Sequence, residues 1–377
     1  MSKRRGEDSQ SQIAGKRSRP EPKKHLYLVL DDWEKGYSIR QIDPYTMLSN
    51  SSSDDLAYAV VDLPEPAAFR FVAPARDTQF FAMGSNNIVA VSSGVDATES
   101  SPPTLVYDTA AAALATAPPL PGHLAGPIIP VADSLYAPTT LGAGMPTAFE
   151  AFSCTPYTDE PSSPRRMQHE WSWKSVDAPP PPPPPPPSSS PAPAAHPDGR
   201  TVFVTTRDAS IGDGVAMTYA FDVERREWTP LGLWALPFLG QGHFDVELDA
   251  WVGLDEDPGY ICACQVPSRS RYTTVPPESD KMEERLFGAR DERTLTYMGD
   301  SKFCLVVSVG LEDAEEEEEE ESVYDREVRV TTFGLKFDRK GELRNTTDRN
   351  VIFSPTSVID GGRAQHIRWG SSHTIRG

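Results

Sequence analysis

One hairpin unit recurs along this chain of 377 residues and constrains the fold more than any other feature of the sequence. In its two clearest copies a short apolar stretch ends in Asp, a turn follows, a large apolar residue comes six positions after the Asp, and proline closes the unit. An Asp at a strand end caps a tight turn through nearby backbone N–H groups, and proline stops a strand. The two clearest copies are Thr104–Asp108 with Leu114 and Pro118–Pro121, and Met217–Asp222 with Trp228 and Leu236–Phe238.

Two further copies are degenerate and keep only part of this order. We expect the large apolar residue of each copy to pack on a neighbouring sheet. Another pair of strands precedes the hairpins, for example Gln79–Gly84 with Ile88–Val91. Sustained helical periodicity is hard to find, and Lys281–Phe287 is the best candidate for a helix. The weaker copies are Thr147–Phe152 with Trp171–Lys174 and Val176–Pro179, and Tyr37–Asp43 with Ala57–Val61 and Leu63–Pro66.

Four short strands repeated about every 45–65 residues are typical of propeller blades. The sequence therefore predicts an all-β propeller of six blades, each a four-stranded antiparallel sheet. A pair of β-sandwiches also uses short strands and is the alternative. The expected blades cover residues 26–66, 67–121, 122–179, 195–237, 238–270 and 285–345.

Composition divides the chain into a body and several low-complexity segments. Residues 1–24 hold eight basic and three acidic residues, a net charge of +5, so the remainder of the −19 total is −24. We expect a disordered basic arm at 1–24, a propeller at 25–345, and a C-terminal segment at 346–377 that is partly ordered or closes the propeller. A proline-rich insertion at 179–194 and an acidic loop at 311–326 interrupt the body.

Charge and hydropathy limit the class of partner. A duplex-binding body needs a positive face, and this body is acidic, so we expect no nucleic-acid ligand. No stretch approaches the roughly 20 apolar residues that span a bilayer, and no apolar leader precedes His25. We therefore expect a monomer in the nucleus and/or cytoplasm, with free thiols at Cys154, Cys262, Cys264 and Cys304.

The hairpin units resemble kelch repeats, in which an aromatic residue and Asp close one strand and a Trp opens the next. Tyr107-Asp108 and Phe221-Asp222 with Trp228 carry this resemblance, although the kelch double glycine is missing. Over roughly residues 25–345 the chain also resembles an uncharacterised plant family known only as a domain of unknown function, with kelch-like relatives. That resemblance implies a fold and a plant origin, without an activity. It is carried by Leu26–Trp33, Ser101–Asp108, Trp171–Trp173, His196–Phe203 and Glu247–Leu254.

No group of residues has the spacing of a catalytic, cofactor or metal site, and we expect none of these. Cys262 and Cys264 lie two apart, which suits one face of a strand, and a zinc site would need two further ligands. Asp255–Gly259 ends in a turn signal and is interpreted as a hairpin tip. Gln241 lies within a Gly-Gln-Gly sequence at an expected blade entry, and His243 follows it; we interpret both as candidate residues of a binding loop.

Three low-complexity tracts each allow two interpretations. The arm carries Lys3, Arg4 and Arg5, then Lys16, Arg17 and Arg19, a separation that suits a bipartite nuclear import signal or a solubilising arm. Pro179–Pro187 forms a stiff polyproline II segment that suits a proline-binding groove or an inert loop. Glu312–Glu321 contains nine acids in ten residues, and suits a basic partner or a solvated hairpin tip.

These features favour a non-enzymatic interaction scaffold that binds a protein partner through a propeller loop face. A first alternative is an enzyme, or a carbohydrate or metabolite binder, that uses the central channel. A second is a substrate receptor of a ubiquitin ligase acting with a separate F-box chain, because only 24 polar residues precede the first strand here.

Overall fold

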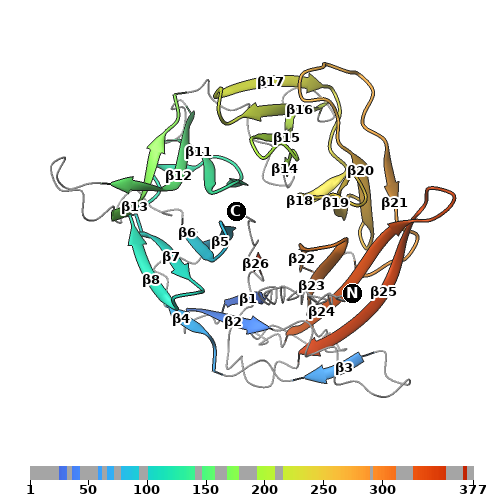
Figure 1. Cartoon of the computed structure of the whole chain (residues 1–377), viewed down its shortest axis with the longest axis horizontal. Helices are drawn as coiled ribbons and strands as arrows, with labels where there is room; N and C mark the ends of the chain where they lie inside the picture. Colours follow the sequence, from blue (N-terminus) through green and yellow to red (C-terminus); the bar gives the residue numbers. More distant parts are fainter. Residues whose placement is uncertain are drawn as a thin grey trace, which may run out of the picture.

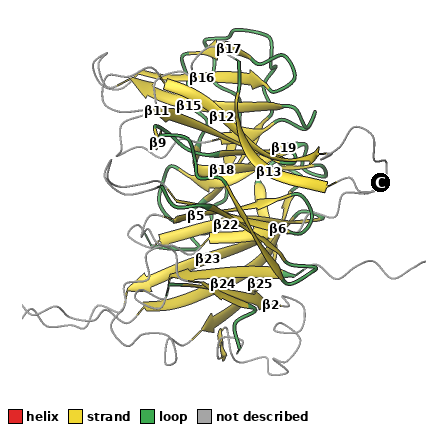
Figure 2. Cartoon of the chain, turned by 90° about the vertical axis from the view of Figure 1, so that its left-hand side faces the viewer, coloured by secondary structure: helices red, strands yellow, loops and turns green. Residues whose placement is uncertain are grey.

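The computed structural model describes thirteen segments of the chain, and every statement below refers to them. Within these segments the chain forms 26 strands and no helix, so the all-β prediction is confirmed (Figure 2). Since the described residues hold no helix, they also hold none that could cross a membrane. The segments are 25–31, 36–42, 58–61, 66–71, 78–92, 101–140, 147–157, 168–177, 193–208, 215–288, 292–310, 326–353 and 368–371.

The strands hydrogen-bond into antiparallel groups of four that follow one another along the chain. The first group is β26 (Arg368–Ser371), β1 (Leu26–Asp31), β2 (Tyr37–Ile42) and β4 (Phe69–Phe71). The second is β5 (Thr78–Met83), β6 (Asn87–Ser92), β7 (Thr104–Asp108) and β8 (Ala113–Ala117). The third is β10 (Ile129–Val131), β11 (Ser134–Thr140), β12 (Thr147–Tyr157) and β13 (Gln168–Ser175), with β9 (His123–Leu124) beside β11.

The remaining strands continue the same pattern. The fourth group is β14 (Pro193–Ala195), β15 (Thr201–Asp208), β16 (Val215–Asp222) and β17 (Glu227–Gly232). The fifth is β18 (Phe238–Asp245), β19 (Ala250–Asp255), β20 (Ile261–Gln265) and β21 (Ser279–Lys281). A parallel pairing of Ala194 with Gly242 joins these two groups into one eight-stranded sheet. The last is β22 (Glu292–Gly299), β23 (Lys302–Gly310), β24 (Arg326–Phe337) and β25 (Leu343–Phe353), with β3 (Tyr58–Val61) at its outer edge.

The sheets stand around a common centre in a β-propeller-like arrangement. Viewed along the shortest axis, β5, β14, β18, β22 and β26 lie toward the middle, and β4, β8, β13, β17 and β21 lie at the periphery (Figure 1). Apolar clusters fill the spaces between neighbouring sheets. One contains Phe152 of β12 and Val106 of β7, and another contains Phe221 of β16 and Phe149 of β12. Burial of one sheet face against the next therefore supplies the core.

The two clearest hairpin units form as predicted. Asp108 Oδ1 accepts hydrogen bonds from the N–H groups of Ala110 (2.8 Å) and Ala111 (3.1 Å). Asp222 Oδ1 does the same for Glu224 and Arg225, both at 3.0 Å. Each Asp satisfies the turn that follows it, which is why the strand ends there.

The large apolar residues of these two units behave differently. Trp228 packs 4.7 Å from Phe221 and 5.7 Å from Phe149, ring centre to ring centre, and so contacts the neighbouring sheet as expected. Leu114 occupies the equivalent position opposite Tyr107 but is 42% exposed, so the prediction that it packs on a neighbouring sheet is wrong.

Strand pairing near the chain ends corrects two expectations. Ala57–Val61 was expected to follow Tyr37–Asp43 in one hairpin unit, but β3 pairs parallel to β25, and β2 pairs with β4 instead. β25 also continues past residue 345, the expected end of the propeller, and β26 of the C-terminal segment pairs with β1. The order of apolar and turn residues along a strand does not show which distant strand it pairs with.

The structure decides two further predictions and does not describe the three low-complexity tracts. The helix expected at Lys281–Phe287 is absent: Lys281 ends β21, and the residues up to Phe287 form bends and turns. Asp255–Gly259 forms the hairpin tip between β19 and β20, as predicted. The arm 1–24, Pro179–Pro187 and Glu312–Glu321 lie outside the described residues.

Candidate functional site

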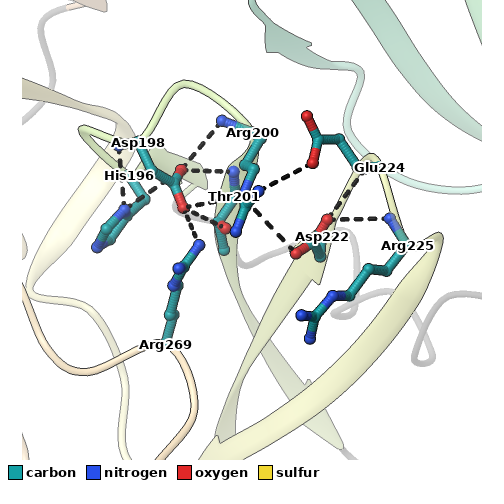
Figure 3. Close-up of polar contacts among 8 residues, drawn as sticks. All are labelled: His196, Asp198, Arg200, Thr201, Asp222, Glu224, Arg225 and Arg269. Carbon is teal, nitrogen blue, oxygen red and sulfur yellow. Dashed lines mark hydrogen bonds and ion pairs between the residues drawn. The ribbon is translucent and has the colours of Figure 1, made fainter.

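Three connections meet at one edge of the fourth and fifth groups and bring eight polar residues together. They are the β14–β15 turn, the β16–β17 turn, and the long loop 266–278 between β20 and β21 (Figure 3). The Val223 N–H donates to Arg200 O at 2.9 Å, which joins the two turns. An ion pair between Arg269 and Asp198 joins the loop to the first turn.

Asp198 organises its turn through both carboxylate oxygens. Oδ1 accepts hydrogen bonds from the N–H groups of Arg200 (3.0 Å) and Thr201 (2.9 Å), and Oδ2 accepts one from the Thr201 hydroxyl at 2.8 Å. Gly199 follows with φ +71°, a conformation that L residues rarely adopt. The His-Pro-Asp-Gly sequence thus encodes this turn locally.

Two guanidinium groups and one imidazole lie around the Asp198 carboxylate. Arg269 pairs with Oδ2, the Arg200 Nε lies 3.7 Å from the same oxygen, and His196 Nδ1 lies 3.3 Å from Oδ1. Burial by itself raises the pKa of Asp198, but the hydrogen bonds from Arg200 and Thr201 and the charge of His196 outweigh it and lower the pKa to about 2. Asp198 is therefore ionised at every physiological pH and serves as an anchor for the loop.

The acidic residues of the β16–β17 turn complete the network. Arg200 Nη1 lies 2.9 Å from Glu224 Oε2, and Arg200 Nε lies 4.0 Å from Asp222 Oδ2. Arg200 thus spans both turns, and Figure 3 shows its side chain between the two groups of carboxylates. These ion pairs hold the two turns together beside loop 266–278.

Beyond the cluster, the same loop carries exposed apolar side chains. The Thr273 N–H donates to Leu231 O at 2.8 Å, and Trp234 Nε1 donates to Thr273 O at 3.2 Å. These bonds place the loop beside the end of β17. Tyr272 and Val275 in the loop and Leu233 after β17 are 50%, 69% and 53% exposed. These three exposed apolar side chains therefore lie on segments that hydrogen bonds hold next to one another.

The sequence predicts a binding loop at Gln241 and His243, but the structure places both residues in a strand. Gln241 and His243 lie in strand β18, where the expected loop is only an irregularity in the pairing with β19 between Leu239 and His243. Gly240 has φ +77° at this irregularity, so the Gly-Gln-Gly signal marks a bulge. His243 Nε2 lies 3.0 Å from Leu295 O of β22, and Gln241 is exposed.

The other candidate residues take structural positions or are not described. His196 stacks on Phe203 with ring centres 5.9 Å apart. Cys262 and Cys264 are free, buried thiols of β20, and burial raises the pKa of both, that of Cys264 to about 12. The proposed import residues Lys3, Arg4, Arg5, Lys16, Arg17 and Arg19 fall outside the described residues.

Neither the Arg269–Asp198 contact nor the patch around Tyr272 has a local signal in the sequence. The contact joins residues 71 positions apart. Within the described segments no three His, Cys, Asp or Glu side chains are grouped so that they could hold a metal ion.

The chain matches one family model and is distantly similar to several solved structures. A family model described as "Protein of unknown function (DUF1668)" matches residues 23–353. No curated protein matches the sequence.

Three solved structures illustrate the distant likeness. A 6-phosphogluconolactonase of Bacteroides uniformis is 13% identical with a TM-score of 0.40, over 86% of this chain and 82% of that one. The periplasmic gluconolactonase of Pseudomonas aeruginosa is 11% identical with a TM-score of 0.40, over 93% and 100%. A protein described as TolB of Agrobacterium tumefaciens is 11% identical with a TM-score of 0.32, over 94% and 99%. At these values the likeness says nothing about activity.

Proposed function

We propose that this chain, which belongs to the DUF1668 family of proteins of unknown function, is a non-enzymatic scaffold that binds a protein partner through a loop face. The face is formed by loop 266–278, the end of β17 and the two turns that hold the loop. We call these residues the loop face below.

One observation carries this proposal. Three large apolar side chains, Leu233, Tyr272 and Val275, are at least half exposed and lie on segments that hydrogen bonds hold side by side. Arg271 is exposed next to Tyr272. Tyr and Arg are enriched among the residues that dominate binding energy at protein interfaces.

The charged residues of the polar cluster beneath the loop contact one another, which supports a structural role for them. Asp198 receives three hydrogen bonds from its own turn and an ion pair from Arg269, and Arg200 bridges Asp198 to Glu224. Charged groups that satisfy one another hold a loop in one conformation and reduce the entropy lost when a partner binds. We infer that the cluster preorganises the loop face.

We further propose that the fold is a six-bladed, kelch-like propeller. Two features support this assignment: the strands fall into six consecutive groups of four, and the Phe221-Asp222 and Trp228 pair follows the order of a kelch hairpin. The outer turns of such a ring are free to vary while the sheets stay fixed.

Affinity capture from an extract of the source organism tests the function. Wild-type protein is compared with a variant carrying Arg271→Glu, Tyr272→Ala and Val275→Asp, and captured proteins are identified by mass spectrometry. A matched control is Val215→Asp, because Val215 is 41% exposed at the other end of β16 from Asp222. We expect a protein captured by the wild type and the control, and lost with the triple variant.

Two results would contradict the proposal. One is a set of captured proteins that is the same for all three forms. The other is no specific protein with any of them. Circular dichroism must first show that the triple variant is folded.

A further inference from the structure

Strand β8 leaves its outer edge unpaired in the described structure. It is the last strand of the sheet β5-β6-β7-β8 and pairs only with β7 there. Its sequence is Ala-Leu-Ala-Thr-Ala, and its first four residues are exposed although side chains alternate between the two faces of a strand. Exposure of consecutive residues means that both faces and the edge of β8 are open to solvent.

Four of the other outer strands, β4, β13, β17 and β21, have features that discourage strand addition, and β8 has none of these features. Charged side chains, proline and short length protect an edge from pairing with another chain. β8 and the turn before it, residues 109–117, contain no charged residue and no proline. By contrast, β4 has three residues with a central Arg70, β21 is Ser-Asp-Lys, β17 contains Glu227 and Pro230, and β13 contains Glu170 and Lys174.

Apolar groups lie on both sides of this edge. Leu114 is opposite Tyr107, whose ring stacks on Phe69 at 4.9 Å, so this side of β8 faces the first group of strands. Ala115 is opposite Val106, which belongs to the cluster with Trp173 of the third group. Alternate side chains of a strand added to β8 would therefore lie beside Leu114 and Thr116 on one face and beside Ala113 and Ala115 on the other.

We propose that β8 binds an extended peptide segment of another protein, which adds a fifth strand to the sheet. The unpaired backbone groups of β8 require an extended partner, because only a strand presents N–H and C=O groups at the matching spacing. The uncharged surroundings favour a segment with small or apolar side chains at the positions that face the sheet.

A second copy of the chain is a poorer occupant. Stable interfaces bury about 800 Å² per partner, and a five-residue strand offers only a fraction of that area. Two copies also each carry a net charge of −19 and repel one another. This site is separate from the loop face, so the proposal does not rest on the proposed function.

The probe is a fluorescent peptide with the sequence of residues 103–109, because Thr104–Asp108 already pairs with β8 on its inner edge. Binding to the full chain is measured by fluorescence anisotropy. Two N-methylated versions remove alternate N–H donors, one version at the second and fourth residues of the strand and the other at the first, third and fifth. Because one edge of a strand presents only alternate donors, we expect one pattern to abolish binding and the other to preserve it.

Variants of the chain locate the site. Leu114→Lys places a charge on the edge without removing a buried side chain, and we expect it to weaken peptide binding at least about tenfold. Thr116→Pro, which removes a backbone donor that points away from β7, has the same expected effect. Tyr272→Ala on the loop face is the matched control and leaves the affinity unchanged.

Any of three results would overturn the proposal. They are no saturable binding of the unmodified peptide up to about 1 mM, equal binding of both N-methylated peptides, and unchanged binding to folded Leu114→Lys protein. A dimer in sedimentation that Leu114→Lys dissociates would show instead that a second copy occupies the edge.

Discussion

The Asp245 carboxylate of β18 accepts two hydrogen bonds from Ser301, a residue of the adjacent sheet. The Ser301 N–H donates to Oδ2 at 3.0 Å and the Ser301 hydroxyl to Oδ1 at 2.8 Å. Oδ1 also accepts the Leu248 N–H at 2.8 Å within the turn of Asp245 itself. Burial and the hydrogen bond with Asp245 raise the pKa of Tyr297. One fully buried side chain thus closes a turn and joins two sheets.

Asp245→Ala should be among the most destabilising single substitutions. It leaves the buried Ser301 N–H and the partly buried Leu248 N–H without their acceptor, while the Ser301 hydroxyl keeps Glu247 Oε2 at 3.2 Å. We expect a loss of about 2–4 kcal/mol in the free energy of unfolding. Denaturant titration measures the change. Asp257→Asn at the exposed β19–β20 tip is the control and should change stability by less than about 0.5 kcal/mol. Equal effects of the two substitutions would refute this account.

The acid sensitivity of stability should depend on Asp198. Its pKa is lowered from 3.8 to about 2 in the folded protein, so its contribution is complete above the unfolded value. That contribution is lost as the pH falls from 3.8 toward 2, because the unfolded chain then binds the proton first. The stability difference between wild type and Asp198→Asn should therefore shrink over this interval. A difference that is constant between pH 5 and pH 2 would contradict the assignment.

Gly253 is required because Phe238 occupies the space beside it. A Cβ on Gly253 would lie 2.5 Å from Phe238 Cδ1, and Phe238 is 1% exposed with no room to move. We expect Gly253→Ala to destabilise the fold by about 1–3 kcal/mol. Phe238→Leu should reduce that cost when the two changes are combined, which a double-mutant cycle measures. Additive effects would show that the two residues do not compete for space.

The four thiols should react in two classes. Burial raises the pKa of Cys262, Cys264 and Cys304, and all three are at most 1% exposed. Cys154 is only partly buried. Because the thiolate is the reactive form, we expect one thiol to react with an aromatic disulfide reagent in the folded protein and the other three only in denaturant. Reaction of all four at similar rates without denaturant would oppose this.

The import signal stays a prediction from the sequence. Replacing Lys16 and Arg17 with Ala in a tagged protein should shift it from nucleus to cytoplasm if the two basic clusters act together. The matched control replaces Lys23 and Lys24 of the same arm, which lie outside both clusters. An unchanged distribution of the first variant would favour the solubilising interpretation.

Local patterns predicted the strands and their turns well. The units around Asp108 and Asp222 were predicted because strand alternation and turn capping act over a few residues. The same reasoning misplaced Gln241 and His243, since a glycine pair marks a bulge as readily as a loop. It also assigned a helix near Lys281, where the chain instead ends a three-residue strand.

The sequence by itself determined an all-β chain of capped hairpins, because each hairpin is specified by side chains within a few positions of one another. Only the tertiary structure decided which sheets face each other and what lies at their edges. Arg269 reaches Asp198 across 71 positions, and β3 pairs with β25 across nearly the whole chain. Such contacts depend on how sheets pack and close, and no local pattern of residues encodes that geometry.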